Sequence, residues 1–326
     1  MSSVRVQVIT LGGTIAMTGG SGVPGVVPRL SGEDLVAAVP GLADGVALAV
    51  DDFRQVPSGS IVLDDVVALA GRIETAAAAG ADGFVVTQGT DTLEETSFLV
   101  DLLYGGEAPV VFTGAMRSPA APGADGPANL LAAVRTAADP AARGLGALVA
   151  FADEIHAARY VRKVHTTSVA GFASPSAGPV GHVVEGVPRL HFSLPRHDAL
   201  PAPLRPATVE LVHATLGGSP GVLAGLGQHA DGLVVAGVGA GHVPESWAEP
   251  LQGLAGRMPV VLASRIGTGS VLTSTYGYPG SESDLLARGL VGAGRLDPYK
   301  ARLLLWALLA AEADASTIRA EFARRG

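Results

Sequence analysis

A threonine and an aspartate lie directly after a short apolar run, in a stretch whose residue types could carry out chemistry. Residues 83–96 read GFVVTQGTDTLEET, so the apolar run ends in Gly-Thr-Asp-Thr and a helical pattern follows. This order places the hydroxyl of Thr90 and the carboxylate of Asp91 on the loop that leaves a buried strand, where open α/β sheets keep their sites. The alternative is that Thr90 or Thr92 only caps the helix expected over 93–103.

A second hydroxyl follows the first apolar run of the chain. Residues 4–11 predict a strand of a buried parallel sheet, and two glycines then permit a tight turn that presents Thr14 at the carboxyl end of that strand. The Gly-Gly-Thr order fits neither the dinucleotide-binding pattern nor the Walker A pattern. A nucleotide site is therefore not expected there.

A polar trio and an isolated lysine complete the set of candidates. Residues 58–60 read Ser-Gly-Ser, which suits the binding of a carboxylate and equally suits the start of the helix expected over 62–79. Lys163 and Lys300 are the only lysines in the chain. Lys163 reads as a solvated charge, as most lysines are. The alternative is that its amine is buried and serves as the base that a threonine hydroxyl needs to act as a nucleophile.

Composition excludes several classes of protein. The chain has no cysteine, so it has no disulfide and no thiolate chemistry, and its histidines lack the spacing of a metal site. A net charge of −8 without basic runs argues against nucleic acid and against an anionic membrane surface as partners. The start of the chain lacks the layout of a secretory signal, and the apolar runs are too short to cross a bilayer, so we expect a cytoplasmic protein.

Strand-like and helical patterns alternate up to about residue 151, which predicts an α/β fold with a doubly wound parallel sheet. The strand ends then bring Thr14, Ser58, Thr90 and Asp91 to one rim. We expect a larger N-terminal domain over 1–195, a proline-rich linker over 196–206, and a smaller C-terminal α/β domain over 207–326.

Two glycine-rich motifs suggest other enzyme classes. Residues 217–221 match the nucleophile elbow G-x-S-x-G, which makes an α/β-hydrolase esterase with Ser219 a rival. Pro220 weakens this interpretation. The oxyanion hole of that fold uses the backbone N–H of the residue after the nucleophile, and proline has no N–H. Residues 237–241 follow a strand but have the spacing G-x-G-x-G, so we interpret them as a turn.

Taken together, the motifs resemble those of the bacterial L-asparaginases and glutaminase-asparaginases. The resemblance covers nearly the whole chain and keeps the order and spacing of that family. The segments that carry it are 11–16, 88–96, 113–117, 124–130, Lys163 with Thr166 and Thr167, and 296–302.

The resemblance implies hydrolysis of a side-chain amide, chiefly that of L-asparagine and more weakly that of glutamine, without a metal or organic cofactor. In this chain Thr14 matches the nucleophile that forms an acyl-enzyme, and Thr90, Asp91 and Lys163 match a second triad. Ser58, with Thr90 and Asp91, matches the substrate-binding set, Ser58 at the α-carboxylate and Asp91 at the α-ammonium. The family is usually a homotetramer whose sites lie between neighbouring subunits.

This sequence departs from the family in one position that bears on mechanism. The family's mobile lid supplies a tyrosine that activates the first threonine, whereas residues 18–30 contain none. The glycine-rich segment 18–28 predicts a mobile lid rather than a regular element. We therefore expect Tyr276 or, preferably, Tyr278 to replace the lid tyrosine, with Glu282 as a nearby acid.

Two smaller departures are Leu11 and Gln88, which stand where the family commonly has threonine and histidine. A non-catalytic amino-acid-binding protein that keeps the pocket without the lid tyrosine is the remaining rival.

Overall fold

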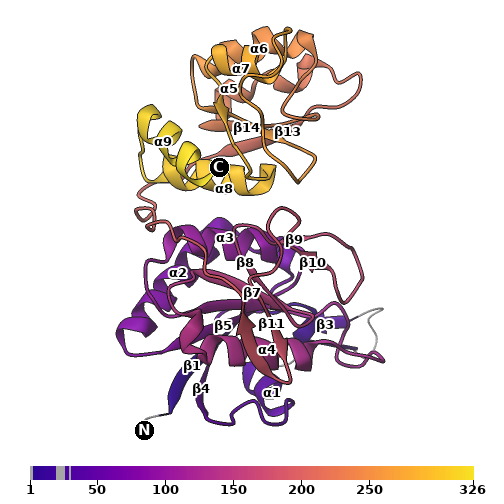
Figure 1. Cartoon of the computed structure of the whole chain (residues 1–326), viewed down its shortest axis with the longest axis vertical. Coiled ribbons are helices and arrows are strands. Elements are labelled where there is room, and N and C mark those ends of the chain that lie inside the picture. The colour runs from indigo at the N-terminus through magenta and orange to yellow at the C-terminus, as the bar shows by residue number, and fades with distance from the viewer. Residues whose placement is uncertain (1–2, 20–25, 29–30) are drawn as a thin grey trace. The chain divides into compact units, whose positions relative to one another are not determined.

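The computed structural model describes residues 3–19, 26–28 and 31–326 of the chain. The chain divides into two compact units, Met1–Ala199 and Leu200–Gly326. Figure 1 shows their helices and strands, and each unit is described here by itself. Within the described residues, no helix is long and apolar enough to cross a membrane.

An eight-stranded sheet forms the centre of the N-terminal unit, in the order β12-β11-β8-β7-β6-β5-β1-β4. The five strands from β7 to β4 are parallel. The strands of this sheet are β1 (Val4–Thr10), β4 (Val46–Asp52), β5 (Gly83–Thr87), β6 (Val110–Thr113), β7 (Ala147–Phe151), β8 (Glu154–Ala157), β11 (Gly181–Val184) and β12 (Val187–Leu190).

Helices cover both faces of the sheet (Figure 1). Apolar side chains of α1 and α4 share a core cluster with one face of β1, β5 and β6, and α2 packs against α3 on the other. The helices are α1 (Gly32–Ala37), α2 (Leu63–Ala78), α3 (Leu93–Leu103) and α4 (Gly126–Ala138). The sequence prediction of a doubly wound α/β fold is confirmed.

The strand order places a topological switch point beside β1. The chain passes from β1 to β4 on one side, and then crosses over to β5 on the other side. At such a point the loops that leave neighbouring strands diverge and form a crevice at the carboxyl end of the sheet. The segments that follow β1, β4 and β5 are the ones that carry Thr14, Ser58 and Thr90.

The sheet is not parallel throughout, unlike the doubly wound parallel sheet that the sequence predicts. β8 returns antiparallel to β7 because Ala152 and Asp153 both have positive φ, 50° and 64°, which closes a two-residue hairpin turn. β11 and β12 continue this antiparallel edge. A separate short ladder pairs β9 (Arg162–Lys163) with β10 (Phe172–Ala173).

The segment expected to be a lid without regular structure contains an antiparallel ladder of two strands. These are β2 (Met17–Gly19) and β3 (Val26–Pro28). Residues 20–25 between them lie outside the described part of the chain, so the expectation of a mobile lid is not tested by the structure.

The C-terminal unit contains a smaller parallel sheet, in the order β13-β14-β15-β16. Its core joins strand residues such as Leu233 and Leu262 to Trp247 of α6. The strands are β13 (Val209–His213), β14 (Gly232–Gly237), β15 (Val260–Ser264) and β16 (Val291–Gly292), and the helices are α5 (Leu226–His229), α6 (Glu245–Ala255), α7 (Glu282–Ala287), α8 (Pro298–Ala310) and α9 (Ala315–Arg325).

A buried histidine in β8 makes stability depend on pH. The His156 side chain is inaccessible to solvent, and its Nδ1 lies 3.1 Å from Ser174 Oγ. Burial, with a smaller contribution from His182, lowers the pKa of His156 from 6.5 to about 4. Between these values the unfolded chain binds a proton that the folded protein does not, so stability is lost as the pH falls from 6.5 towards 4.

We therefore expect this group to remove about 1.4 kcal/mol of unfolding free energy per pH unit in that interval. Denaturant unfolding at pH 7.5 and pH 5.0 measures it, with His156→Gln as the test and the exposed His229→Gln as the control. The His156 variant should show a shallower pH dependence than wild type, whereas the His229 variant should match it. Equal pH dependence in all three proteins would contradict the assignment.

Candidate active site

Two glycines bring the loop after β1 against the loop after β5. Gly12 and Gly13 have φ of +96° and +91°, a conformation that residues with a side chain rarely adopt. A Cβ atom on Gly13 would lie 2.1 Å from the backbone nitrogen of Gly89, so only glycine permits this approach. The contact places Thr14 and Thr90 each one residue away from the point where the two loops meet.

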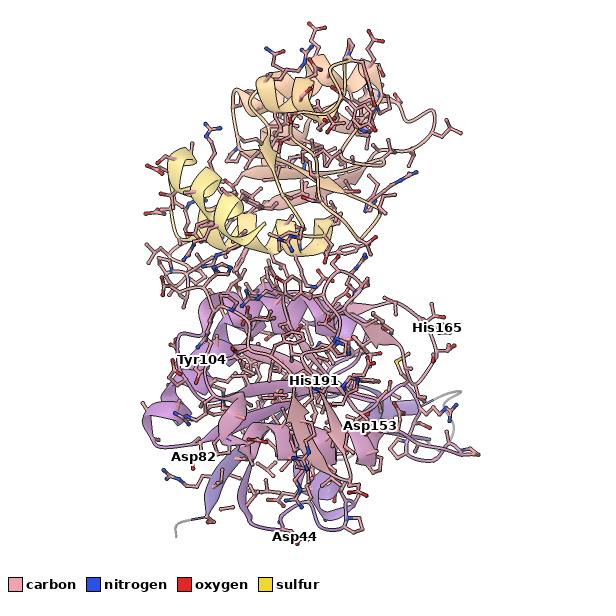
Figure 2. The ribbon with its side chains drawn as sticks, in the orientation of Figure 1. Asp44, Asp82, Tyr104, Asp153, His165 and His191 are labelled. Atoms are coloured by element: carbon pink, nitrogen blue, oxygen red, sulfur yellow. The ribbon has the colours of Figure 1, made fainter. Side chains whose placement is uncertain are left out.

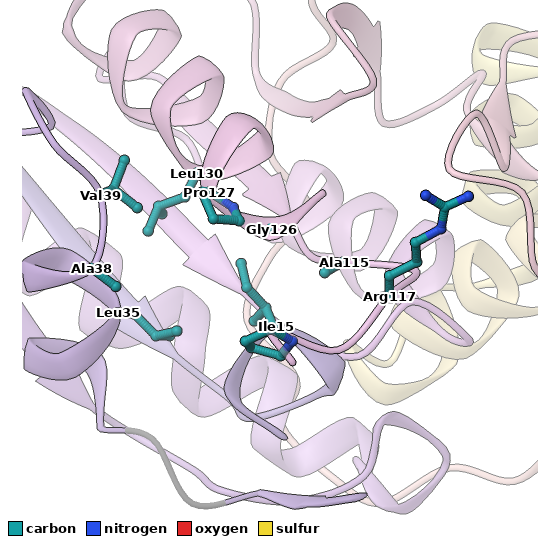
Figure 3. Close-up of a pocket in the computed structure, with 10 residues that line it drawn as sticks. Ile15, Leu35, Ala38, Val39, Ala115, Arg117, Gly126, Pro127 and Leu130 are labelled. Atoms are coloured by element: carbon teal, nitrogen blue, oxygen red, sulfur yellow. The ribbon is translucent and has the colours of Figure 1, made fainter. Parts of the chain in front are cut away.

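The short 3-10 helix η1 (Thr14–Ala16) is anchored by its second residue. Ile15 is 3% exposed and lines a small apolar cavity of about 50 Å³, together with residues that include Leu35 and Leu130 (Figure 3). Thr14 stays partly exposed beside this buried neighbour. The anchor therefore holds the Thr14 backbone while its side chain is not enclosed by the core.

Ser58 links the loop after β4 to the loop after β5. It is 4% exposed and begins the 3-10 helix η2 (Ser58–Ser60), and its Oγ accepts a hydrogen bond from the Asp91 backbone N–H at 3.3 Å. The Thr92 hydroxyl donates to the Ser58 carbonyl oxygen at 2.9 Å. Thr92 stands at the N-cap of α3 but makes no side-chain cap hydrogen bond, so the capping interpretation of this threonine is wrong.

Lys163 contacts both members of the Thr-Asp pair. Its Nζ donates to Thr90 Oγ1 at 2.9 Å and to Asp91 Oδ1 at 2.5 Å. The Lys163 side chain is 15% exposed and that of Asp91 is 76% exposed, so the amine is largely enclosed while the carboxylate faces solvent. The structure thus brings Lys163 to two adjacent residues that precede it by 73 and 72 positions in the sequence.

Glu94 holds the Lys163 backbone in place. It lies in the first turn of α3, it is 9% exposed, and its Oε2 accepts a hydrogen bond from the Lys163 N–H at 2.6 Å. From the sequence it reads only as a helix-terminal carboxylate that suits the positive end of the helix dipole. The apolar residues around the end of β5 were the one available signal that this carboxylate would be buried.

The amine and carboxylate open onto a cavity of about 360 Å³, lined by Asp91, Lys163 and the following residues 164–166. One of these is His165, which Figure 2 labels on the loop that follows β9. A hydroxyl beside an enclosed amine and a carboxylate can exchange protons along this short path. A small polar molecule in the cavity would meet the Lys163 amine and the Asp91 carboxylate.

The remaining predicted site residues, Tyr278 and Glu282, belong to the C-terminal unit. Glu282 is fully buried, and its Oε1 accepts the backbone N–H groups of Thr275 and Tyr276, both at 2.8 Å. Burial acts to raise its pKa, but these two donors and the nearby His242 outweigh burial and lower the pKa below its ordinary value. Glu282 is therefore held as a carboxylate.

His242, for which the sequence predicted no role, contacts Glu282 and both tyrosines of this segment. Its Nδ1 lies 3.3 Å from Glu282 Oε2, and its ring centroid lies 5.0 Å from that of Tyr276 and 5.6 Å from that of Tyr278. Both tyrosines are about half exposed, at 45% and 49%. The only sequence signal for His242 was its place after the glycine-rich turn at the end of β14.

Ser219, the nucleophile of the esterase interpretation, does not have the geometry of a nucleophile elbow. Ser219 is the N-cap of a 3-10 helix, has an ordinary extended backbone, and uses its Oγ to accept the Gly221 N–H at 3.1 Å. A nucleophile elbow needs a strained turn and a backbone donor on the next residue, and Pro220 supplies no donor. The serine esterase interpretation is not supported.

Known proteins are similar to this chain over nearly its whole length. The N-terminal asparaginase domain model matches residues 5–196, and the glutaminase/asparaginase C-terminal domain model matches residues 208–322. A probable L-asparaginase from Deinococcus radiodurans is 38% identical over 98% of this chain and 97% of its own length. A probable periplasmic L-asparaginase from Haemophilus influenzae is 34% identical over 98% of this chain and 92% of its own.

A solved structure has the same fold. The crystal structure of a probable cytoplasmic L-asparaginase from Campylobacter jejuni superimposes with a TM-score of 0.88 and 31% identity, and covers 98% of this chain and 99% of that one.

Proposed function

The chain belongs to the asparaginase family, and from this premise we propose that it hydrolyses the side-chain amide of L-asparagine to L-aspartate and ammonia. The observation that carries the proposal is the contact of Lys163 Nζ with both Thr90 Oγ1 and Asp91 Oδ1 in a chain of this family. Glutamine is a second, weaker substrate in this proposal.

In the first half of the reaction, the Thr14 oxygen forms a bond to the side-chain amide carbon. The hydroxyl proton passes to a base and from there to the amide nitrogen, the C–N bond breaks, and ammonia leaves. Water then adds to the ester of the acyl-enzyme, which releases aspartate and restores the Thr14 hydroxyl. In this proposal, backbone N–H groups around Thr90 stabilise the oxyanion that develops in each half.

Lys163, Thr90 and Asp91 form the proton-handling group. The largely enclosed amine of Lys163 takes the Thr90 hydroxyl proton while that hydroxyl takes one from the attacking group, and it returns the proton when ammonia or the Thr14 hydroxyl leaves. The Asp91 carboxylate stabilises the ammonium in between. Because the amine contacts both partners directly, no additional group is needed between them.

Substrate recognition falls to the loops after β4 and β5. The Ser58 hydroxyl accepts the Asp91 N–H, which leaves its own proton free to donate to the α-carboxylate of the substrate. The exposed carboxylate of Asp91 suits the α-ammonium group. In this proposal, Ser58 and Asp91 hold the two charged ends of the α-amino acid, and its side-chain amide reaches Thr14.

One steady-state assay tests the proposal. Ammonia release is measured with L-asparagine, D-asparagine and L-glutamine, and L-asparagine should give the highest kcat/KM. An enzyme that spares L-asparagine contradicts the proposal, and a protein that binds it without turnover is the non-catalytic homologue instead.

The group that activates Thr14 is the phenol of Tyr278, with Glu282 beside it. In support, Tyr278 is half exposed, contacts the His242 ring, and neighbours a carboxylate that two backbone donors hold in place. We expect Tyr278→Phe to lower kcat/KM for L-asparagine by about 10-fold or more, since general acid–base groups contribute on that scale or above. Tyr276→Phe is the matched control, and full kcat/KM in both variants would overturn the assignment.

The quaternary structure and compartment are also part of the proposal. A homotetramer, which the family resemblance implies, would place the Tyr278 and Glu282 cluster of one subunit at the site of another. Sedimentation velocity at micromolar concentration tests the tetramer. A cytoplasmic location, as in the Campylobacter jejuni protein, is tested by fractionation of cells that express the chain.

A further inference from the structure

A buried side-chain amide, that of Gln88, lies on the loop that carries the proposed catalytic residues Thr90 and Asp91. Gln88 directly follows β5, and its side chain is fully buried. Its Nε2 donates to the Gly89 carbonyl oxygen at 3.3 Å and to Thr96 Oγ1 at 3.2 Å. Its backbone N–H donates to the Thr113 carbonyl at 3.1 Å, so both ends of the residue are fixed.

The Gln88 amide contacts the first of two threonines that link α3 to the Ser58 segment. Because Thr96 Oγ1 accepts from Gln88, its single proton is left for the Thr92 carbonyl, to which it donates at 3.1 Å. The Thr92 hydroxyl in turn donates to the Ser58 carbonyl at 2.9 Å. Thr96 and Thr92 thereby connect the Gln88 amide to the segment that carries Ser58.

The side-chain oxygen of Gln88 costs the fold stability. Gln88 Oε1 is buried and accepts no hydrogen bond from the described part of the protein. An unpartnered buried acceptor destabilises a fold, and an apolar side chain of the same length would avoid that cost. The polar group is therefore not explained by stability alone.

We propose that Gln88 is a positioning residue for the reaction. Its donor group holds the Gly89 carbonyl on one side of Thr90 and, on the other side, the Thr96 hydroxyl in the first turn of α3, where that hydroxyl and two backbone N–H groups share the Thr92 carbonyl. The Thr90 hydroxyl is thereby held at the Lys163 amine, and Ser58 is held at the Asp91 N–H. This inference rests on the proposed function, because it concerns the rate of the same reaction.

Gln88→Met tests the role, because methionine keeps the length of the side chain and removes both the donor and the unpartnered acceptor. We expect kcat for L-asparagine to fall at least ~10-fold while KM changes less than ~3-fold and the melting temperature stays within a few degrees of wild type. The control is Thr136→Val, which deletes an equally buried bond, Thr136 Oγ1 to the Ala132 carbonyl at 2.8 Å, in α4. That variant should lower the melting temperature and leave kcat unchanged.

A double-mutant cycle separates positioning from general packing. If Gln88 acts through Thr96, Thr96→Val should also lower kcat, and the double variant should fall no further than the more impaired single variant. Additive losses in the cycle, or wild-type kcat in either folded single variant, overturn the inference. A wild-type protein that releases no ammonia from L-asparagine overturns the proposed function instead, so the two failures are distinguishable.

Discussion

Replacing Thr14 by alanine is expected to lower kcat for L-asparagine hydrolysis by at least ~10²-fold, because the variant has no oxygen with which to form the acyl-enzyme. This loss corresponds to about 2.7 kcal/mol of the activation barrier. The fold should persist, since Ile15 anchors η1 in its apolar cavity and the Gly13 contact involves only backbone. Steady-state ammonia release measures the effect.

Two companion variants make the Thr14 result specific. Thr14→Ser keeps a hydroxyl and should retain far more activity than Thr14→Ala. Thr75→Ala removes an exposed threonine of α2 and should leave kcat unchanged. Near-wild-type turnover in Thr14→Ala would show that another group attacks the amide.

Thr90→Val is expected to lower kcat on the same scale for a different reason. Valine keeps the shape of the side chain but leaves the Lys163 amine without its 2.9 Å partner. A mass-spectrometric search for the acyl-enzyme separates the two threonines, because Thr90→Val can still form it slowly whereas Thr14→Ala cannot. An equal covalent population in both would contradict the division of roles.

The position of the proposed catalytic threonines could be predicted from the sequence because each follows a short apolar run. Parallel strands put their carboxyl ends on one edge, so Thr14 and Thr90 had to share a rim once the α/β alternation was recognised. The contact between Gly13 and Gly89 could not be predicted in the same way. It depends on which strands are neighbours in the sheet, and local patterns do not specify that order.

The hydrogen-bond partners of side chains that make tertiary contacts could not be predicted from the sequence. Thr92 has the position and type of a helix cap, yet its hydroxyl donates to Ser58 on another loop. Glu94 reads as a helix-terminal carboxylate and is also a buried acceptor for the Lys163 backbone N–H. In both cases the partner lies more than 30 residues away in the sequence, Ser58 in η2 and Lys163 in β9, so tertiary contacts overrode the local pattern.

Lys163→Met is expected to abolish most of the activity while leaving the fold intact. Methionine keeps the apolar stem and removes the amine that contacts Thr90 and Asp91, so kcat should fall by at least ~10²-fold. The stability change should stay within about 1 kcal/mol, because Asp91 is 76% exposed and is hydrated once its partner is gone. The Glu94 anchor persists, since it binds the backbone N–H of residue 163.

Comparison with Lys163→Arg shows whether Lys163 acts as a base or only as a fixed positive charge. Arginine keeps the positive charge but does not release its proton in a protein, so it can replace lysine as a fixed cation and cannot replace it as a base. If Lys163 accepts a proton during the reaction, both variants should be nearly inactive although the arginine variant still pairs with Asp91. Substantial kcat in Lys163→Arg would reduce the lysine to electrostatic support, and an active Lys163→Met enzyme would remove it from the mechanism.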